Sequence, residues 1–248
     1  MTPTTAQPAP LDPADLAALG EASTATLTTQ LFKLGLRNTY LSGLRSLSPR
    51  APRMVGEAFT LRYIPAREDI DVLEVYDDYD HPQRKAVESV GPGQVLVMDC
   101  RGQGRAASAG NILLTRLACR QAAGVVTDGT LRDVAGIGEL DLPVFAAGPA
   151  AMTNLALHHA VDLQAPIGCG GVPIYPGDVL VGDADGVVCV PRHLVAVIAQ
   201  PARAQERLED FLQARVAGGA PLRGTYPPDA QTLRLYHEQG SDLLARQP

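Results

Sequence analysis

The sequence predicts an α/β domain with a mixed central sheet and flanking helices. Between residues 91 and 148, short apolar segments alternate with a helix-like segment, a spacing typical of a parallel β-α-β unit. Residues 167–191 are instead rich in glycine, proline and β-branched side chains, which favours several short strands joined by tight turns. The two patterns together place a parallel unit and strand-and-turn structure in one domain.

The composition indicates an acidic, folded chain. It has 248 residues, of which 46% are hydrophobic and 19% charged, and a formal net charge of -6. A chain of this length buries a real core. The acidic balance argues against nucleic acid as a main partner. No apolar run reaches the roughly 18 residues of a membrane span, and the N-terminus lacks the features of a secretory signal. We therefore expect a cytoplasmic protein with no membrane partner.

The chain divides into a domain and two arms. Residues 1–13, rich in Thr, Pro and Ala, are expected to form a flexible arm. The domain is predicted to span residues 14–215, and residues 216–248 form a C-terminal arm with a final short helix. Within the domain, the first two helices are expected to start near Pro13 and near Ser23.

The remaining elements follow from local patterns. Partial alternation and β-branched residues predict strands, and amphipathic segments closed by glycine predict helices. The expected order is a strand at 54–63, a charged and partly helical segment at 65–91, a strand at 91–100, a glycine-rich connection at 101–110, a helix at 111–124, a strand at 124–129, a short helix at 132–143 and a strand at 144–148. A helix-like apolar run carries His158 and His159, whose adjacent positions favour packing over a joint metal site. A long helix at 193–219 contains Pro201, which should kink it or end its first part.

The connection before the helix at 111–124 predicts an anion site. Ser108 or Asn111 can act as N-cap, which leaves the backbone N–H groups of Asn111, Ile112 and Leu113 at the open end of the helix. Such groups, together with the helix dipole, bind carboxylate or phosphate. We therefore expect an acidic group of a ligand to be received here.

Charged side chains follow the next strand. Asp128, Arg132 and Asp133 come at or just beyond its carboxyl end, where parallel sheets bind ligands. With the helix N-terminus, an arginine and a carboxylate can hold an anionic substrate beside a divalent cation. The alternative is that Asp133 caps a short helix and pairs with Arg132 in solvent, and spacing alone favours this alternative.

Lysine chemistry is disfavoured. The chain contains only two lysines, Lys33 and Lys85, and neither lies in a segment that predicts a dry pocket. A Schiff-base lysine needs such a pocket or a cationic neighbour to lower its pKa.

Two longer segments resemble a known family. They are GVVTDGTLRDVAGIGELDLPVFAAG at 124–148 and PIYPGDVLVGDADGVVCVP at 173–191. The motifs V-x-D-G-x-x-R-D and P-G-D-x-x-x-G-D-x-D-G-V are specific in combination. The chain resembles the RraA-like proteins, which include 4-hydroxy-4-methyl-2-oxoglutarate aldolases and ribonuclease E activity regulators. The resemblance covers about residues 20–210, and residues 67–90 are longer than is usual in the family.

The resemblance implies a swivelling β/β/α-type fold and a homotrimer or hexamer with active sites between subunits. It implies a pyruvate aldolase that depends on Mg²⁺ or Mn²⁺ and also decarboxylates oxaloacetate. By position, Arg132 would hold the substrate and Asp133 would bind the metal, largely through and alongside waters. Gly110, Asn111, Ile112 and Leu113 would receive the pyruvate carboxylate.

Two positions depart from the family pattern. Gly136 and Asn111 stand where the aldolases carry acidic residues. Asn can ligate a cation or form hydrogen bonds, but it cannot accept a proton as a carboxylate does. The charged segment 67–90 would either supply a substitute acid, such as Glu68 or Asp71, or form a solvated surface excursion.

The leading hypothesis is therefore a metal-dependent lyase of the class II pyruvate aldolase type, acting on a small 2-oxo acid. The first alternative is a protein-binding regulator of a ribonuclease, which would not need Asp133. The second is a dehydratase or aldolase for a sugar-derived 2-oxo acid, whose longer substrate would suit the added segment.

Overall fold

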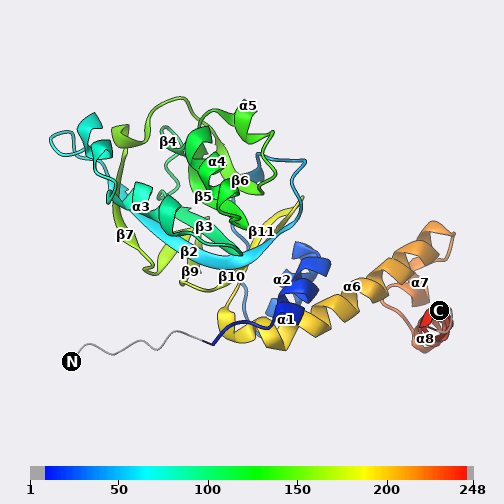
Figure 1. The fold of residues 1–248 in the computed structure, drawn as a ribbon. Coiled ribbons are helices and arrows are strands. Elements are labelled where there is room, and N and C mark those ends of the chain that lie inside the picture. Colours follow the sequence, from blue (N-terminus) through cyan, green and yellow to red (C-terminus); the bar gives the residue numbers. More distant parts are fainter. Residues whose placement is uncertain (1–8, 245–248) are drawn as a thin grey trace.

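The computed structural model describes residues 9–244, so most of the predicted N-terminal arm, residues 1–8, lies outside the described residues (Figure 1). The strands are β1 (Arg45–Ser46), β2 (Met54–Pro65), β3 (Gln94–Asp99), β4 (Ala107–Ala109), β5 (Gly124–Leu131), β6 (Val144–Pro149), β7 (His158–Leu163), β8 (Ile167–Cys169), β9 (Val172–Ile174), β10 (Val179–Asp183) and β11 (Gly186–Val190). The α-helices are α1 (Pro13–Glu21), α2 (Thr24–Lys33), α3 (Pro82–Ser89), α4 (Asn111–Cys119), α5 (Val134–Ile137), α6 (Val195–Ala217), α7 (Leu222–Thr225) and α8 (Ala230–Leu244). Short 3-10 turns are η1 (Leu73–Asp77), η2 (Asn154–Ala156) and η3 (Arg192–Leu194).

Nine strands form one mixed sheet, as the sequence predicts. Its order is β1-β6-β5-β3-β2-β10-β11, with β4 added to β5 and β7 added to β2. The inner strands β2, β3, β5 and β6 are parallel, whereas β1, β7, β10 and β11 pair antiparallel with their neighbours. Strands β8 and β9 form a separate hairpin. The mixed central sheet and flanking helices confirm the predicted fold class.

The parallel strands are buried on both faces, which explains their continuous apolar sequence. In β3, Leu96 and Met98 belong to the core that α3 and α4 cover. The alternate residues Val95 and Val97 belong to a second core, which the β8–β9 hairpin and the β10–β11 pair close. Figure 1 shows α3 and α4 on one side of β2 and β3, and β9 on the other side of β2. The carboxyl end of β5 is thus held between two packed layers.

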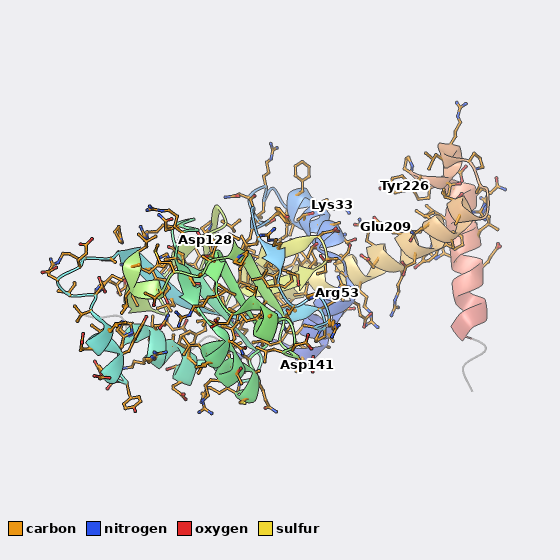
Figure 2. The ribbon with its side chains drawn as sticks, turned by 90° about the horizontal axis from the view of Figure 1, so that it is seen from above. Lys33, Arg53, Asp128, Asp141, Glu209 and Tyr226 are labelled. Atoms are coloured by element: carbon orange, nitrogen blue, oxygen red, sulfur yellow. The ribbon has the colours of Figure 1, made fainter. Side chains whose placement is uncertain are left out.

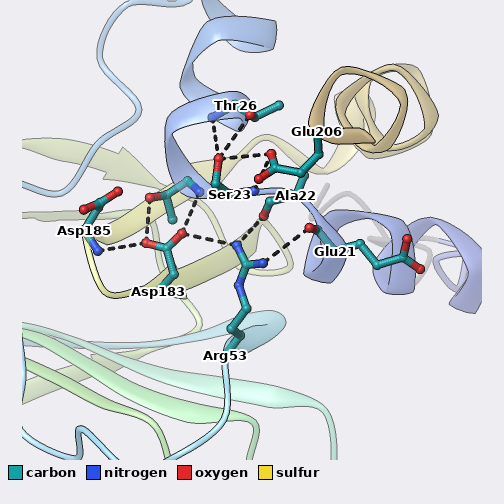
Figure 3. A network of polar contacts seen from close by, with 9 residues as sticks. Glu21, Ala22, Ser23, Thr26, Arg53, Asp183, Asp185 and Glu206 are labelled. Atoms are coloured by element: carbon teal, nitrogen blue, oxygen red, sulfur yellow. Dashed lines mark hydrogen bonds and ion pairs between the residues drawn. The ribbon is translucent and has the colours of Figure 1, made fainter. Parts of the chain in front are cut away.

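A third core and a polar network fasten α1, α2 and α6 to β10 and β11 (Figure 3). Thr24 donates to Asp183 from its backbone N–H at 2.8 Å and from its hydroxyl at 2.7 Å. Arg53 Nη2 lies 3.2 Å from the same carboxylate. Burial raises the pKa of Asp183, but the hydrogen bonds from Thr24 and Asp185 outweigh it and leave that pKa below its ordinary value. This Asp of the second family motif therefore has a structural role.

Two local predictions are wrong. The helix-like run before His159 is the η2 turn followed by β7, which pairs antiparallel with β2. The last helix, α8, has 15 residues and is not short. Of the two outcomes predicted for Pro201, a kink or an end of the first part, the helix does not end, because α6 continues through Pro201. Figure 2 shows α6 leading away from the sheet, with Glu209 along it and Tyr226 beyond it, so the C-terminal arm stands apart from the domain.

Among the described residues, no helix is both long and apolar enough to cross a membrane.

Candidate active site

The predicted site forms where β4, α4 and the end of β5 meet. Strand β4 pairs with β5, so Ala107 lies opposite Thr130 and the chain then turns into α4 beside Arg132. The backbone N–H of Arg132 donates to the carbonyl of Ala109 at 3.1 Å. This register brings the start of α4 against the R-D pair, as the sequence predicts for the carboxyl end of a parallel strand.

Arg132 and Asp133 lie side by side at the protein surface. Arg132 Nε is 3.7 Å from Asp133 Oδ2, and their side chains are 47% and 57% exposed. Asp133 has φ 61° and ψ 36°, the left-handed conformation that non-glycine residues seldom adopt. Such strain is concentrated at functional sites. The backbone conformation aims the Asp133 carboxylate back toward α4, where it accepts the Asn111 N–H at 3.4 Å.

Gly110 makes this close approach possible. A Cβ at Gly110 would lie 2.7 Å from Asp133 Oδ2, closer than Cβ contacts come, and a tight 3.1 Å from Arg132 Cγ, so the Asp133 carboxylate would have to shift. Gly110 is also the N-cap of α4, with no side-chain cap. Neither predicted N-cap holds that position, because Ser108 lies in β4, where its hydroxyl donates to the carbonyl of Thr130 at 3.0 Å, and Asn111 is the first helical residue.

Fewer backbone N–H groups are free at the start of α4 than the sequence predicts. The Leu113 N–H donates to the carbonyl of Gly110 at 3.1 Å, and the Asn111 N–H faces Asp133. The Ile112 N–H has no hydrogen-bond partner among the described residues. The helix can therefore receive one acidic group through Ile112, and through Asn111 if the Asp133 carboxylate turns toward a cation.

The two departures from the family pattern are structurally linked. A Cβ at Gly136 would lie 2.5 Å from Nδ2 of Asn111. The absence of a side chain at Gly136 therefore leaves the space that the Asn111 amide occupies. The resemblance implies two carboxylates at these positions, and this chain has one amide there instead, so this corner carries less negative charge than the resemblance implies.

The site lines a cavity of about 160 Å³. It is lined by Gly110, Ile112, Leu113, Arg132 and Asp133. Asn111 does not line the cavity, but its backbone N–H bonds to Asp133, which does. Larger hollows of about 490 Å³ over α2 and 850 Å³ beside α6 have no Arg-Asp pair at a helix N-terminus among their lining residues. Chemistry rather than size selects the smaller cavity.

Sequence reasoning missed one part of the wall of this cavity. It consists of Tyr76 from η1, Gln83 and Arg84 from α3, and Thr153 and Asn154 at the start of η2. The amides of Gln83 and Asn154 donate to the carbonyl of Ser108 at 2.6 and 3.1 Å, which ties this wall to β4. The one sequence signal was the extra length of residues 67–90, which suggested a contribution to the cleft without naming the residues.

The two substitute acids named from sequence do not line the cavity. Glu68 is exposed, and the Asp71 carboxylate is 3% exposed and bonds to His159 Nδ1 at 2.7 Å. The contact with Asp71 also gives His159 a structural role.

Asp128 lies behind the site rather than in it. Its carboxylate accepts the backbone N–H groups of Cys100 at 2.7 Å and Gly102 at 2.9 Å. Burial raises its pKa, partly offset by these bonds. Burial likewise raises the pKa of the nearby Cys100 thiol to about 12, so this thiol is not a nucleophile at neutral pH.

The donor set suits a weakly held, hydrated cation. No three His, Cys, Asp or Glu side chains of the described part are grouped as metal ligands. Mg²⁺ commonly binds through one or two carboxylates and keeps several waters. Asp133, exposed at the cavity, fits that mode of binding.

The fold and this corner define an α/β protein with an Arg-Asp pair at a helix N-terminus. The family model RraA-like, described as Aldolase/RraA, matches residues 24–189, and the chain belongs to this family.

Similar proteins carry both of the family's names. The chain is 37% identical over 125 residues to a candidate 4-hydroxy-4-methyl-2-oxoglutarate aldolase of Halalkalibacterium halodurans, covering 49% of this chain and 58% of that protein. It is 33% identical over 123 residues to the 4-hydroxy-4-methyl-2-oxoglutarate aldolase of Thermus thermophilus, covering 49% and 73%. The crystal structure of Streptomyces coelicolor RraAS2, titled an unusual member of the RNase ES inhibitor RraA family, matches with TM-score 0.72 and 30% identity over 83% of this chain and 98% of that one.

Proposed function

We propose that the protein is a divalent-metal-dependent lyase of the class II pyruvate aldolase type, acting on a 2-oxo acid and able to decarboxylate oxaloacetate. The observation that supports this most is the Arg132–Asp133 pair, 3.7 Å apart, set against the amide end of α4 in one cavity. The aldolase names of relatives at 33–37% identity support the same reaction class.

Each residue has a defined part in the proposed reaction. Asp133 would hold Mg²⁺ or Mn²⁺ together with waters. The cation, when bound, supplies Lewis acidity at the 2-oxo group. Arg132 would place its guanidinium beside the 2-oxo oxygen, where negative charge develops as the C–C bond breaks. The amide end of α4 would fix the 1-carboxylate.

The proton balance is closed by water. With oxaloacetate, the bond between C3 and the departing carboxylate breaks, and its electron pair moves toward the 2-oxo group. Carbon dioxide leaves, and C3 then takes a proton from water to give pyruvate. Asn111 cannot exchange a proton with that water, because it is an amide and does not line the cavity.

Pyruvate release from oxaloacetate tests the proposal. We expect release by the full chain with Mg²⁺ or Mn²⁺, a loss with EDTA, and a loss with Asp133→Ala. Lys85→Gln, on the exposed face of α3, is the control and should keep full activity. A rate that is the same with EDTA, or with Asp133→Ala, would reject the metal-dependent mechanism.

We also propose a homotrimer or hexamer with active sites between subunits. Ile112 is 85% exposed at the cavity, and both Arg132 and Asp133 are about half exposed, so a partner subunit has room to cover them. Light scattering should give the mass of a trimer or hexamer, and a monomer would contradict the proposal.

The second candidate is a protein-binding regulator of a ribonuclease. The similarity to the Streptomyces RraAS2 structure supports it. This candidate predicts co-purification with an RNase E-type enzyme that Asp133→Ala leaves intact. Failure of such a pull-down would remove this candidate and leave the lyase proposal untouched.

A further inference from the structure

The cavity contains a second arginine without an acidic partner. Arg84 is half-buried and lines the same cavity as Arg132. Its neighbours on α3 are paired, since Lys85 Nζ lies 3.2 Å from Asp80 and Glu88 lies 2.8 Å from Arg116. Among the described side chains, no carboxylate forms an ion pair with Arg84.

The place of Arg84 on its helix is electrostatically unfavourable. Helix α3 begins at Pro82, so Arg84 lies in its first turn, where the helix dipole disfavours a cation. His81, the N-cap, provides no side-chain hydrogen bond that would offset this. Positions that break a local rule in this way are concentrated at functional sites. An anion bound at Arg84 would benefit from both the guanidinium and the helix end.

Tyr76 holds Arg84 in position. The Arg84 Cζ lies 4.3 Å from the centroid of the Tyr76 ring, and the Tyr76 hydroxyl donates to Asn154 Oδ1 at 3.4 Å. A guanidinium stacked on an aromatic ring keeps its in-plane N–H groups free for a carboxylate. The nearby Asp71 carboxylate is already bonded to His159 and to the Arg67 N–H, at 2.7 Å each. The local acid therefore does not supply the missing partner.

We propose that Arg84, stacked on Tyr76, is a specificity-determining residue that binds a second carboxylate of the substrate, at the end of the chain remote from the 2-oxo group. This inference rests on the proposed function, because the 1-carboxylate is assigned to α4. The cavity is lined by two cationic groups, Arg132 beside α4 and Arg84 on α3, which would give a dicarboxylic 2-oxo acid one guanidinium at its 2-oxo acid head and one for its second carboxylate. Its volume of about 160 Å³ suits a small acid rather than a drug-sized ligand.

A matched pair of ligands isolates the second carboxylate. The two probes are 2-oxoglutarate and 2-oxopentanoate, which have the same chain length and the same 2-oxo acid head but differ in the terminal carboxylate. Calorimetry on the full chain with Mg²⁺ gives both dissociation constants. We expect the wild type to bind 2-oxoglutarate roughly 10- to 100-fold more tightly, as one bidentate, charge-assisted contact provides.

Four variants distinguish the roles of the cations. Arg84→Gln should weaken the binding of 2-oxoglutarate by that same factor and should change the dissociation constant of 2-oxopentanoate by less than about twofold. Arg84→Lys keeps the positive charge but loses the paired N–H groups of the guanidinium. Its affinity for 2-oxoglutarate should fall between those of the wild type and Arg84→Gln. Arg132→Gln should weaken the binding of both probes. Lys85→Gln should change neither, and a melting curve checks that each variant is folded.

The outcomes separate this inference from the proposed function. If the wild type binds neither probe, the 2-oxo acid site is rejected and the role of Arg84 falls with it. If the wild type binds both probes equally, or Arg84→Gln weakens both by the same factor, the second-carboxylate site is rejected while the 2-oxo acid site stands.

Discussion

Replacing Asp133 should separate stability from activity. The residue is both the proposed cation ligand and a non-glycine residue at φ 61°. Asn tolerates this backbone conformation, Gly adopts it freely and Ala does not. We therefore expect Asp133→Asn, Asp133→Gly and Asp133→Ala to lose metal-dependent activity alike, while their stabilities differ.

The magnitudes follow from the contacts of Asp133. Its ion pair with Arg132 is long and about half exposed, so its loss costs at most about 1 kcal/mol after solvent screening. Alanine in the left-handed region adds roughly 1–2 kcal/mol. Glycine avoids that strain but has about 0.5–1 kcal/mol more unfolded-state entropy to lose. Asp133→Ala should thus be the least stable of the three, by about 1 kcal/mol relative to Asp133→Gly.

Urea unfolding and pyruvate release on the same preparations test this. For a chain of this size, about 1 kcal/mol corresponds to a melting shift of about 2–4 °C, so thermal curves should agree with the urea midpoints. If Asp133→Ala is as stable as Asp133→Gly, the backbone strain is no larger than the roughly 0.5–1 kcal/mol entropy cost of glycine, and the expected strain is contradicted. If Asp133→Gly or Asp133→Ala keeps metal-dependent turnover, Asp133 is not the ligand.

Three further substitutions test the geometry of the site, the binding of substrate and the stability of the fold. Gly110→Ala would place its Cβ 2.7 Å from the Asp133 carboxylate, so pyruvate release should fall at least roughly tenfold while the urea midpoint barely moves; an unchanged rate would show that the close approach is irrelevant. Arg132→Lys keeps the charge without the fork and should raise KM for oxaloacetate by roughly tenfold, and an unaltered KM would exclude bidentate binding. Asp183→Asn should lower the free energy of unfolding by about 1–3 kcal/mol at neutral pH, because Thr24 loses a charged acceptor. Since the folded pKa of Asp183 lies below 3.8, this stabilisation is lost as the pH falls through that lower pKa, and urea curves at acid pH should show variant and wild type converging.

The parallel core could be predicted from sequence because its residues face the same environment on both sides. Val95 to Met98 form a continuous apolar run that only a doubly buried strand requires. The segment around His158 could not be predicted as a strand, because its local pattern suits a helix. It becomes β7 through pairing with β2, where Pro65 lies opposite His158, and that partner is remote in sequence. Tertiary pairing overrides local preference there.

The site divides in the same way. Arg132 and Asp133 could be predicted because they are adjacent and follow a recognisable strand, whereas the wall with Tyr76 and Arg84 reaches the cavity only through the packing of α3 beside β7 and α4.

Several choices in this corner are unfavourable when taken one at a time: Asp133 is in a left-handed conformation, Gly110 leaves α4 without a side-chain cap, and Arg84 lies at the wrong end of a helix dipole. No carboxylate within the described residues pairs with Arg84, which instead contacts the Tyr76 ring. A bound dianion with a cation would satisfy the helix end, Arg84 and Asp133 together, and the proposed ligand would therefore account for three features that the fold leaves unfavourable.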